Sequence, residues 1–293
     1  MELNQRLDQE LTAEQKIKFQ KDNGRFKLLN NIVLIPIATA LLGIYLESIL
    51  IVSISIVCVI IFLLLSIGTF SKRNVVYEDV IIPCVLREKF ENVECNKESN
   101  MVLDELNKSK LFGNYDKAQV KNSYTVTKEK YNITLSKISV KKLHVEENDG
   151  VVDKNLEEIF SGAFAYAKLP SKSTSNFKVI AKSEDNSLEN KIAITYTDFN
   201  NCYDVYTLNP VEVRNILSPG VMARILEFNS KVDKIINFSI IDDTIYISVN
   251  YDNFLEFNAN GKKYINEVEA IKELDLVEIM DIFIRYFVNM YEK

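Results

Sequence analysis

The stretch Ile32–Ile67, IVLIPIATALLGIYLESILIVSISIVCVIIFLLLSI, contains one charged residue, Glu47. Its second part, Ile49–Ile67, has nineteen residues without a charge. As an α-helix this part would be about 28 Å long, close to the hydrocarbon thickness of a bilayer. Such a stretch is typical of a transmembrane helix.

The first part of this stretch is a second candidate span. Counted back to Leu28 it also reaches about nineteen residues, and Pro36 falls near one end, where a missing backbone N–H costs least. Glu47 and Ser48 lie between the two spans and allow the chain to reverse in the interface. We therefore predict a two-span transmembrane hairpin over residues 28–70, which places the protein in the cell membrane.

Two other interpretations of these segments are weaker. A cleaved signal peptide does not fit, because the preceding flank is long and polar and no small-residue cleavage site separates the two apolar parts. A buried helix pair in a soluble core would need amphipathic partners that the rest of the chain does not supply. The two-span interpretation is therefore preferred.

The basic residues flanking the apolar segments predict the orientation. No basic residue lies between the spans, whereas both outer flanks are basic: Lys16, Lys18, Lys21, Arg25 and Lys27 on one side, and Lys72 and Arg73 on the other. Since basic residues favour the cytoplasmic side, we expect both termini to be cytoplasmic. The chain then divides into a cytoplasmic segment (1–27), the hairpin (28–70) and a cytoplasmic domain (71–293).

The composition of the predicted cytoplasmic domain argues against nucleic acid as a partner. The whole chain looks like an average soluble protein, with 26% charged residues and a mean hydropathy of −0.03. After position 70 the chain has 29 basic and 35 acidic residues, a balance that does not favour general binding of nucleic acid. The four cysteines, Cys58, Cys84, Cys95 and Cys202, form no paired framework and fit reduced thiols.

The period of the apolar residues predicts an α+β domain. Alternation over 124–145, 160–169, 177–181, 192–196 and 202–206 indicates antiparallel strands, and 236–240 and 245–249 alternate on either side of an Asp242-Asp243 turn. Helices are predicted over 75–90, bent at Pro83, and over 101–111. A helix capped by Ser218 starts at Pro219, and an amphipathic helix covers 268–291. We expect an antiparallel sheet with flanking helices.

The same segments resemble a known bacterial family. The blocks, in order, are DVIIPCVL (79–86), LFGNYD (111–116), IFSGAFAY (159–166), FNNCYDVY (199–206), NILSPGVMARIL (215–226) and FSIIDDTIYISV (238–249). Together with the N-terminal hairpin they resemble the family known as domain of unknown function 3137. The resemblance implies the architecture and no activity. The segment 170–181 departs from the family's pattern, so any ligand preference of that loop does not carry over.

Catalytic and metal-binding motifs are missing from the sequence. His144 is the one histidine, and no cysteine or second histidine lies close to it in sequence to complete a metal site. There is no GxxxxGK, HExxH, GxSxG or GxGxxG pattern. The acidic pairs Glu146-Glu147 and Asp242-Asp243 fit solvated turns. We nominate no catalytic, metal or cofactor-binding residue and expect no cofactor.

Two groups of residues are candidates for contacts. A lysine cluster inside the acidic domain could meet anionic lipid headgroups, and its members are Lys128, Lys130, Lys137, Lys141 and Lys142, with Lys117 and Lys121 upstream. A solvated strand face explains the cluster equally simply. An aromatic group on the last helix could form a face for a protein partner: Phe283, Tyr286, Phe287 and Tyr291.

Three classes of function stay open. The first is a membrane-anchored interaction or sensing module with an unknown protein partner, which needs no catalytic residues. The second is a homo-oligomeric transport or channel accessory subunit, in which Thr39, Gly43, Ser53 and Ser55 would allow close helix approach and self-association. The third is a membrane-attached enzyme acting on lipid or nucleotide. It ranks last because no nucleophile and base can be named together.

Overall fold

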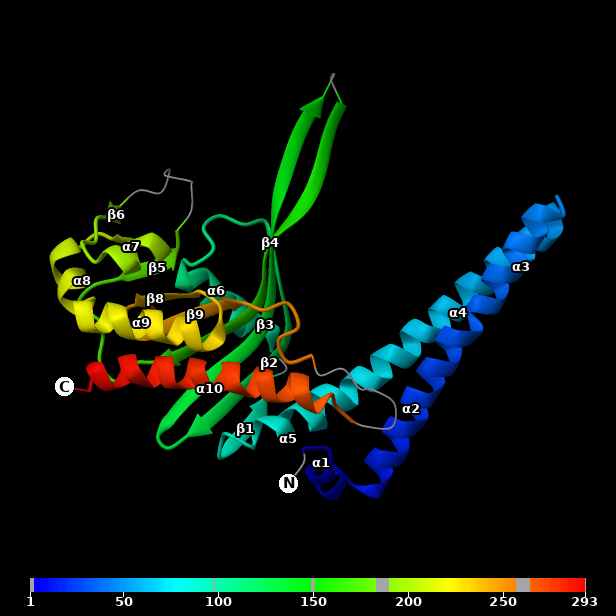
Figure 1. The fold of residues 1–293 in the computed structure, drawn as a ribbon, viewed down its shortest axis with the longest axis horizontal. Coiled ribbons are helices and arrows are strands. Elements are labelled where there is room, and N and C mark those ends of the chain that lie inside the picture. The colour runs from blue at the N-terminus through cyan, green and yellow to red at the C-terminus, as the bar shows by residue number, and fades with distance from the viewer. Residues whose placement is uncertain (1–2, 97, 149–150, 183–189, 257–263, 293) are drawn as a thin grey trace. The chain divides into compact units, whose positions relative to one another are not determined.

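The computed structural model describes residues 3–96, 98–148, 151–182, 190–256 and 264–292 (Figure 1). The chain forms two compact units, and each is treated by itself. One unit comprises residues 1–85 and 259–267, and the other comprises residues 86–258 and 268–293. This boundary reflects packing, whereas the predicted boundary at residue 71 concerns the edge of a bilayer.

The first unit is built from helices. Its elements are α1 (Leu3–Glu10), α2 (Ala13–Ile32), α3 (Leu34–Tyr45), α4 (Ile49–Val76), the π-helical turn η1 (Tyr77–Ile81) and the start of α5 (Ile82–Leu86). Thr12 and Gln15 form a capping box at the start of α2. Between α2 and α3 the helix is interrupted only at Val33, because Pro36 cannot donate a bond to the preceding turn.

The predicted helix over 75–90 is the continuation of α4 and ends at Leu86. The π-helical turn η1 ends two residues before Pro83. Proline lacks the N–H and its ring collides with the carbonyl four residues earlier, so a widened turn at this place lets the helix continue. The expected bend at Pro83 thus corresponds to a local change of helix type.

The segment Tyr264–Glu267, which we call the strap, is held by α1 and α2 within the first unit. The side-chain oxygen of Asn4 accepts bonds from the N–H groups of Tyr264 (2.9 Å) and Ile265 (3.2 Å). The Tyr264 hydroxyl donates to Asp8 (2.9 Å), and the Tyr264 ring lies 5.4 Å from that of Phe19. Residues almost at opposite ends of the chain therefore share one small core.

The second unit contains a sheet of nine antiparallel strands in the order β1-β2-β3-β4-β9-β8-β5-β7-β6. The strands are β1 (Asn92–Cys95), β2 (Lys117–Lys128), β3 (Tyr131–Asn148), β4 (Val151–Lys168), β5 (Phe177–Ala181), β6 (Lys191–Ile192), β7 (Tyr203–Thr207), β8 (Ile236–Ile241) and β9 (Thr244–Asn250). The predicted α+β class, with two N-terminal apolar helices before an antiparallel sheet and flanking helices, is confirmed.

Helices cover both faces of this sheet (Figure 1). On one face Val102 and Leu106 of α6 (Ser99–Ser109) pack against Ile138 of β3 and Phe164 of β4. The remaining helices of this unit are α7 (Thr197–Cys202), α8 (Pro210–Ile216), α9 (Pro219–Val232) and α10 (Glu267–Met290). On the other face of the sheet, Phe238 of β8 packs against Phe283 of α10, and α9 lies beside α10. The alternating strand pattern thus supplies two buried faces.

Several local predictions agree with the structure and some need correction. The hairpin around Asp242-Asp243 is confirmed, with Asp242 at φ 54°, as a tight turn requires. Ser218 is the N-cap residue of α9 and Pro219 its first residue, as predicted, although the Ser218 side chain makes no capping bond. The strand expected over 192–196 is wrong in extent, because β6 comprises Lys191 and Ile192 and shares only Ile192 with that range.

Candidate functional site

Two helical stretches of the first unit are long and apolar enough to cross a membrane: Ala13–Tyr45, which joins α2 and α3, and Ile49–Ile67 of α4. Only about a tenth of the most apolar window in each is buried inside the protein (12% and 11%). The exposed side chains on α3 and α4 include Leu34, Ile35, Leu41, Leu42, Ile44, Ile49, Leu50, Ile54, Ile56, Val57, Ile60 and Ile61. A soluble protein would not leave so much contiguous apolar surface uncovered.

Small residues form the seam between α3 and α4. A side chain at Gly43 would come within 2.9 Å of Ile51 and 3.0 Å of Val52. The Thr39 and Ser55 hydroxyls lie 2.9 Å apart and share a hydrogen bond between the helices. Thr39, Gly43 and Ser55 are therefore used within one chain, so the self-association suggested through them is not needed to explain them.

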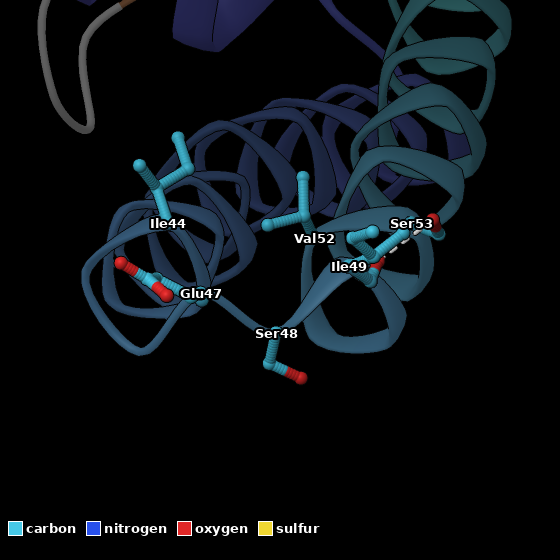
Figure 2. A pocket seen from close by; sticks show the side chains of 7 residues that line it. Ile44, Glu47, Ser48, Ile49, Val52 and Ser53 are labelled. Carbon is cyan, nitrogen blue, oxygen red and sulfur yellow. Dashed lines mark hydrogen bonds between the residues drawn. The ribbon is translucent and has the colours of Figure 1, made fainter.

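A shallow hollow lies at the turn of this hairpin (Figure 2). Glu47 adopts a left-handed conformation (φ 50°), and the Ser48 N–H bonds to the Gly43 carbonyl at 2.9 Å, which closes the turn. In Figure 2 Ser48 points away from the helices, while Ser53 is bonded to the Ile49 carbonyl (2.8 Å). Ile44, Ile49 and Val52 supply the aliphatic part of the lining, and Gly43, Glu47, Ser48 and Ser53 complete it, so the hollow follows from the shape of the turn.

The predicted aromatic partner face belongs largely to the core of the second unit. Phe283 and Phe287 are fully buried, and their rings lie 5.2 Å from that of Phe238. Tyr291 is half-buried and shares a hydrogen bond with Ser173 (2.9 Å), and Tyr286 is also half-buried. Phe283 and Phe287 therefore cannot belong to an exposed face, because this side of α10 packs on the sheet.

Three lysines of the predicted cluster form ion pairs within the second unit. Lys128 pairs with Asp281 (3.4 Å), Lys130 with Glu292 (2.5 Å) and Lys137 with Glu256 (2.7 Å). These ion pairs offset part of the positive charge of the three lysines within the unit, and their contact with lipid headgroups stays a prediction. For Lys141 and Lys142, in contrast, no carboxylate oxygen lies within 4 Å of the ammonium group among the residues that the structure describes.

A buried charge cluster lies where α10 packs over the β9–α10 connection. Glu273 is 1% exposed and accepts a bond from the Leu255 N–H (2.6 Å). Burial raises the pKa of Glu273 to about 8; the Leu255 bond and Lys137 oppose the shift, while the neighbouring carboxylates Glu269 and Glu256 add to it. The side chain of Lys137 is 3% exposed. Glu273 is therefore the acid of this cluster that stays protonated near neutral pH.

A second buried acid lies on the same helix. Asp281 is 1% exposed, and one of its oxygens accepts a bond from Arg285 (2.8 Å) and lies 3.4 Å from Lys128. Its other carboxylate oxygen has no hydrogen-bond partner in the described structure. The two basic side chains compensate the buried charge, which fits a structural role in attaching α10 to the sheet.

On the opposite face of the sheet, a polar group attaches α6. The Tyr246 hydroxyl donates to Glu105 (2.6 Å), and Lys108 pairs with the other oxygen of Glu105 (2.7 Å). Burial and the adjacent Glu105 raise the pKa of Tyr246, so the phenol stays protonated. Within the described residues no group of three or more His, Cys, Asp or Glu side chains could hold a metal ion. His144 is exposed on β3.

One feature that the sequence reading missed is a protruding β-ribbon. β2 pairs with β3 only up to Lys141, and β9 pairs with β4 only from Gly162. Residues 142–148 and 151–157 pair only with each other, and Figure 1 shows them extending away from the sheet. We call this ribbon the arm. The length of β3 and β4 indicates the arm, because each strand has eighteen residues and strands usually have about five or six.

Backbone irregularities mark the base of the arm. The register shifts between Val140 and Lys141, which leaves Ile159 as an extra residue on β4. Nearby, a side chain at Gly162 would collide with the carbonyl of Val249 (2.3 Å) and the N–H of Tyr251 (2.6 Å), so only glycine fits. Bulges increase strand twist and bend the strand, which accounts for the change in direction here.

The comparisons with known proteins identify a family for part of the chain. Residues 158–284 match the family model described as protein of unknown function, DUF3137. This range contains four of the resembling blocks, while 79–86 and 111–116 lie outside it. The family resemblance is confirmed over that range. No curated protein and no solved structure matches the chain.

Proposed function

Taking the chain as one that carries a DUF3137 region, we propose that it is a membrane-anchored interaction module with its second unit on the cytoplasmic side. The observation that carries the proposal is the apolar hairpin. Its seam is filled by small residues of one chain, and its outer surface is aliphatic and uncovered. Lipid is the solvent that such a surface requires.

The cytoplasmic orientation is supported by charge. Basic residues flank both outer ends of the hairpin, and the turn at Leu46–Ser48 has none. This asymmetry favours placing residues 1–27 and the second unit on the same, cytoplasmic, side of the membrane.

An interaction role fits the second unit better than catalysis does. Its unusual acid, Glu273, is buried on α10 and accepts a hydrogen bond from the Leu255 N–H. The arm, in contrast, extends beyond the residues that pair with β2 and β9, and in the part of the chain that the structure describes its two strands pair only with each other. Protruding ribbons with free edges are suited to pairing with another strand.

The anchor and its orientation can be tested by three experiments. We expect the full chain to stay with the membrane after alkaline carbonate extraction. A reporter fused after Lys293 should be active only where it folds in the cytoplasm, and a cysteine introduced at Ser48 should react with an impermeant thiol reagent from the outer side. Release by carbonate would contradict the anchor, and a reporter active outside the cytoplasm would contradict the orientation.

A further inference from the structure

The arm is an element that a single copy of the chain supports poorly. It is a two-stranded ribbon, and such ribbons are marginal in water unless further strands or helices join them. Leu143 and Leu156 lie directly opposite each other across it and are 39% and 48% exposed, and Val145, on the same face, is 52% exposed. Additional strands beside the arm would cover part of this apolar face and supply backbone partners.

The outer edge of β4 is the open edge of the arm. β9 begins to pair with β4 at Gly162, and in the described structure no strand other than β3 pairs with residues 154–161. The side chains of residues 154–159 are all exposed. The β3 edge is already used at the base of the arm, because the Leu143 N–H donates to the Asp116 carboxylate (2.7 Å). A further strand therefore has room beside β4.

The backbone groups of every second residue point to this open edge. Along a strand, N–H and carbonyl groups alternate between the two edges. The Leu143 N–H faces the β2 side, so the even-numbered residues of β3 in the arm face β4 and are paired there with odd-numbered residues. Lys154, Leu156 and Glu158 therefore direct their N–H and carbonyl groups outward, toward the place of an added strand.

The residues at this edge, 154–158 with the sequence KNLEE, are complementary to themselves in antiparallel order. A second copy of β4, related by a two-fold axis at Leu156, brings Lys154 opposite the second copy's Glu158 and places the two copies of Leu156 opposite each other. Each charge pair occurs twice by symmetry, and opposite charges across strands are favourable. Among the described residues, Lys154 forms no ion pair within its own chain. Its charge is therefore available to a second copy.

The same register extends the apolar face of the arm. Opposite residues share a face of a sheet, so Leu143 and Leu156 of both copies form one row of leucines across four strands. On the same face, Glu158 lies between Lys141, its partner on β3, and Lys154 of the second copy. Ser139 donates to one oxygen of Glu158 (2.5 Å) and holds this carboxylate on that face. The apolar and the charged residues of the two arms thus match in one register.

The existing strands keep their places in this arrangement. The paired residues are 154–158, and residues 159–161 separate them from Gly162, where β9 begins to pair with β4. The extra residue Ile159 bends β4 at this point, so the added strand leaves the edge before it reaches β9. β2 lies on the other side of β3 and takes no part.

We propose that two copies of this chain associate through the β4 edges of their arms, forming a four-stranded antiparallel sheet with a two-fold axis at Leu156. The partner of the interaction module proposed above is then a second copy of the chain, and the inference rests on that function only for the role of the contact. Lys154 and Glu158 determine the register, and the leucine row supplies the apolar contact.

Disulfide trapping tests the position of the axis. In the full chain with its four cysteines replaced by serine or alanine, Leu156→Cys places two thiols opposite each other. The Cα atoms of such a pair are about 5.5 Å apart, a separation that a disulfide spans. Leu143→Cys is the matched control, because Leu143 faces Leu156 across the same ribbon and each variant removes one leucine of the row. In the four-stranded sheet the two copies of residue 143 lie about 14 Å apart, three strand spacings.

The oxidation is done in isolated membranes with copper phenanthroline and read on non-reducing gels. We expect a product of twice the chain mass at position 156, roughly tenfold more abundant than at position 143. Equal trapping at both positions, stronger trapping at 143, no trapping at 156, or a product with a different protein would overturn the proposal. Retention in the pelleted membranes is scored in the same samples, so failure of the anchor and failure of the pairing are distinguishable.

Charge reversal tests the register. Adding Lys154→Glu to the Leu156→Cys chain should reduce the trapped product about fivefold, and so should Glu158→Lys, because each homodimer then opposes like charges at two places. Co-expression of the two variants, one carrying an affinity tag, should restore the cross-linked product as a heterodimer, since Glu at 154 of one copy then meets Lys at 158 of the other.

The control for charge reversal is Glu157→Lys. It makes the same change in charge one residue away from Glu158, but residue 157 faces the uncharged Asn155 of the second copy in the proposed register. Trapping through Leu156→Cys should therefore change less than about twofold. Undiminished trapping with Lys154→Glu or Glu158→Lys, an equal loss with Glu157→Lys, or no recovery on co-expression contradicts the register.

Discussion

Helices α4 and α10 are both long and rich in apolar residues, yet the protein treats them oppositely. In α10 the apolar residues recur at helical spacing, and Phe283 and Phe287 are completely buried against the sheet. In α4 the apolar residues surround the helix, and 11% of the membrane-length window is buried. The difference teaches that arrangement, more than apolar content, separates a helix for a protein core from one for lipid.

The largest effect on this difference between α4 and α10 is expected when charged residues are placed in α4. Ile56→Arg with Ile60→Arg should cost about 5–7 kcal/mol of insertion free energy, at about 2.5–3.5 kcal/mol for each charge near the centre of a span. We expect most of the protein to leave the carbonate-resistant membrane fraction, measured by immunoblot. The conservative pair Ile56→Leu with Ile60→Leu should remain membrane-bound, and a fully inserted double-arginine variant would argue against the span.

The next largest effect is expected beneath α10. Phe238→Ala removes the ring that contacts both Phe283 and Phe287, and should lower the free energy of unfolding of the second unit by about 3–5 kcal/mol. The chain has no tryptophan and fourteen tyrosines, so near-ultraviolet circular dichroism of tyrosine in urea is the readout, using full-length protein in detergent. Ile271→Ala, on the exposed side of α10, should change stability by less than about 0.5 kcal/mol.

Burial under α10 also predicts a dependence on pH. The raised pKa of Glu273 means that the folded state keeps a proton that the unfolded state has lost between roughly pH 4.5 and 8. Its contribution to stability therefore falls as pH rises through this window, by up to about 1.4 kcal/mol per pH unit. Glu273→Gln should remove this slope, and its stability relative to the natural chain should increase from pH 5.5 to pH 8.

A matched control lies on the same helix. Lys89 holds the pKa of Glu278 below its usual range, so this carboxylate is charged in both states above pH 5.5. For Glu278→Gln the difference in unfolding free energy from the natural chain should stay constant from pH 5.5 to pH 8. The same constant difference for Glu273→Gln would show that the Glu273 pKa is not raised.

The smallest effect is expected in the seam of the hairpin. Thr39→Val keeps the shape of the side chain and removes the bond to Ser55, which should cost about 0.6–1.7 kcal/mol of helix association. The readout is cross-linking between α3 and α4 through a cysteine pair placed at the hairpin turn. Ser53→Ala is the control, because Ser53 bonds to its own helix at Ile49 and should leave the cross-linking unchanged.

The sequence predicts an element of this fold correctly where the residues of that element alone determine its structure. The uncharged run of Ile49–Ile67 indicates a span without any tertiary information, and Asp242-Asp243 fixes the β8–β9 hairpin locally. It fails where the partner comes from a distant part of the chain. Periodicity identifies the apolar side of α10 but does not indicate that the sheet covers it, so the sequence alone predicts an exposed face that includes Phe283 and Phe287.

The lysine cluster shows the same limit. Proximity in sequence predicts one basic surface, whereas Lys128 and Lys137 pair with carboxylates that lie more than a hundred residues later in the chain. The base of the arm is equally invisible in the sequence, because it depends on where β2 and β9 stop pairing. Only the unusual length of the alternating stretch 124–145 is visible in the sequence itself.

The strap has a practical consequence for anyone who wishes to isolate the sheet domain. Cutting the chain after residue 70 would remove Asn4, Asp8 and Phe19 and leave Tyr264 and Ile265 without the groups that bury them. The second unit is also discontinuous, since the chain leaves it at Asn258 and returns at Val268. A fragment that keeps α1 and α2, joined by a short linker in place of the hairpin, would preserve this small core and is the better choice for crystallisation.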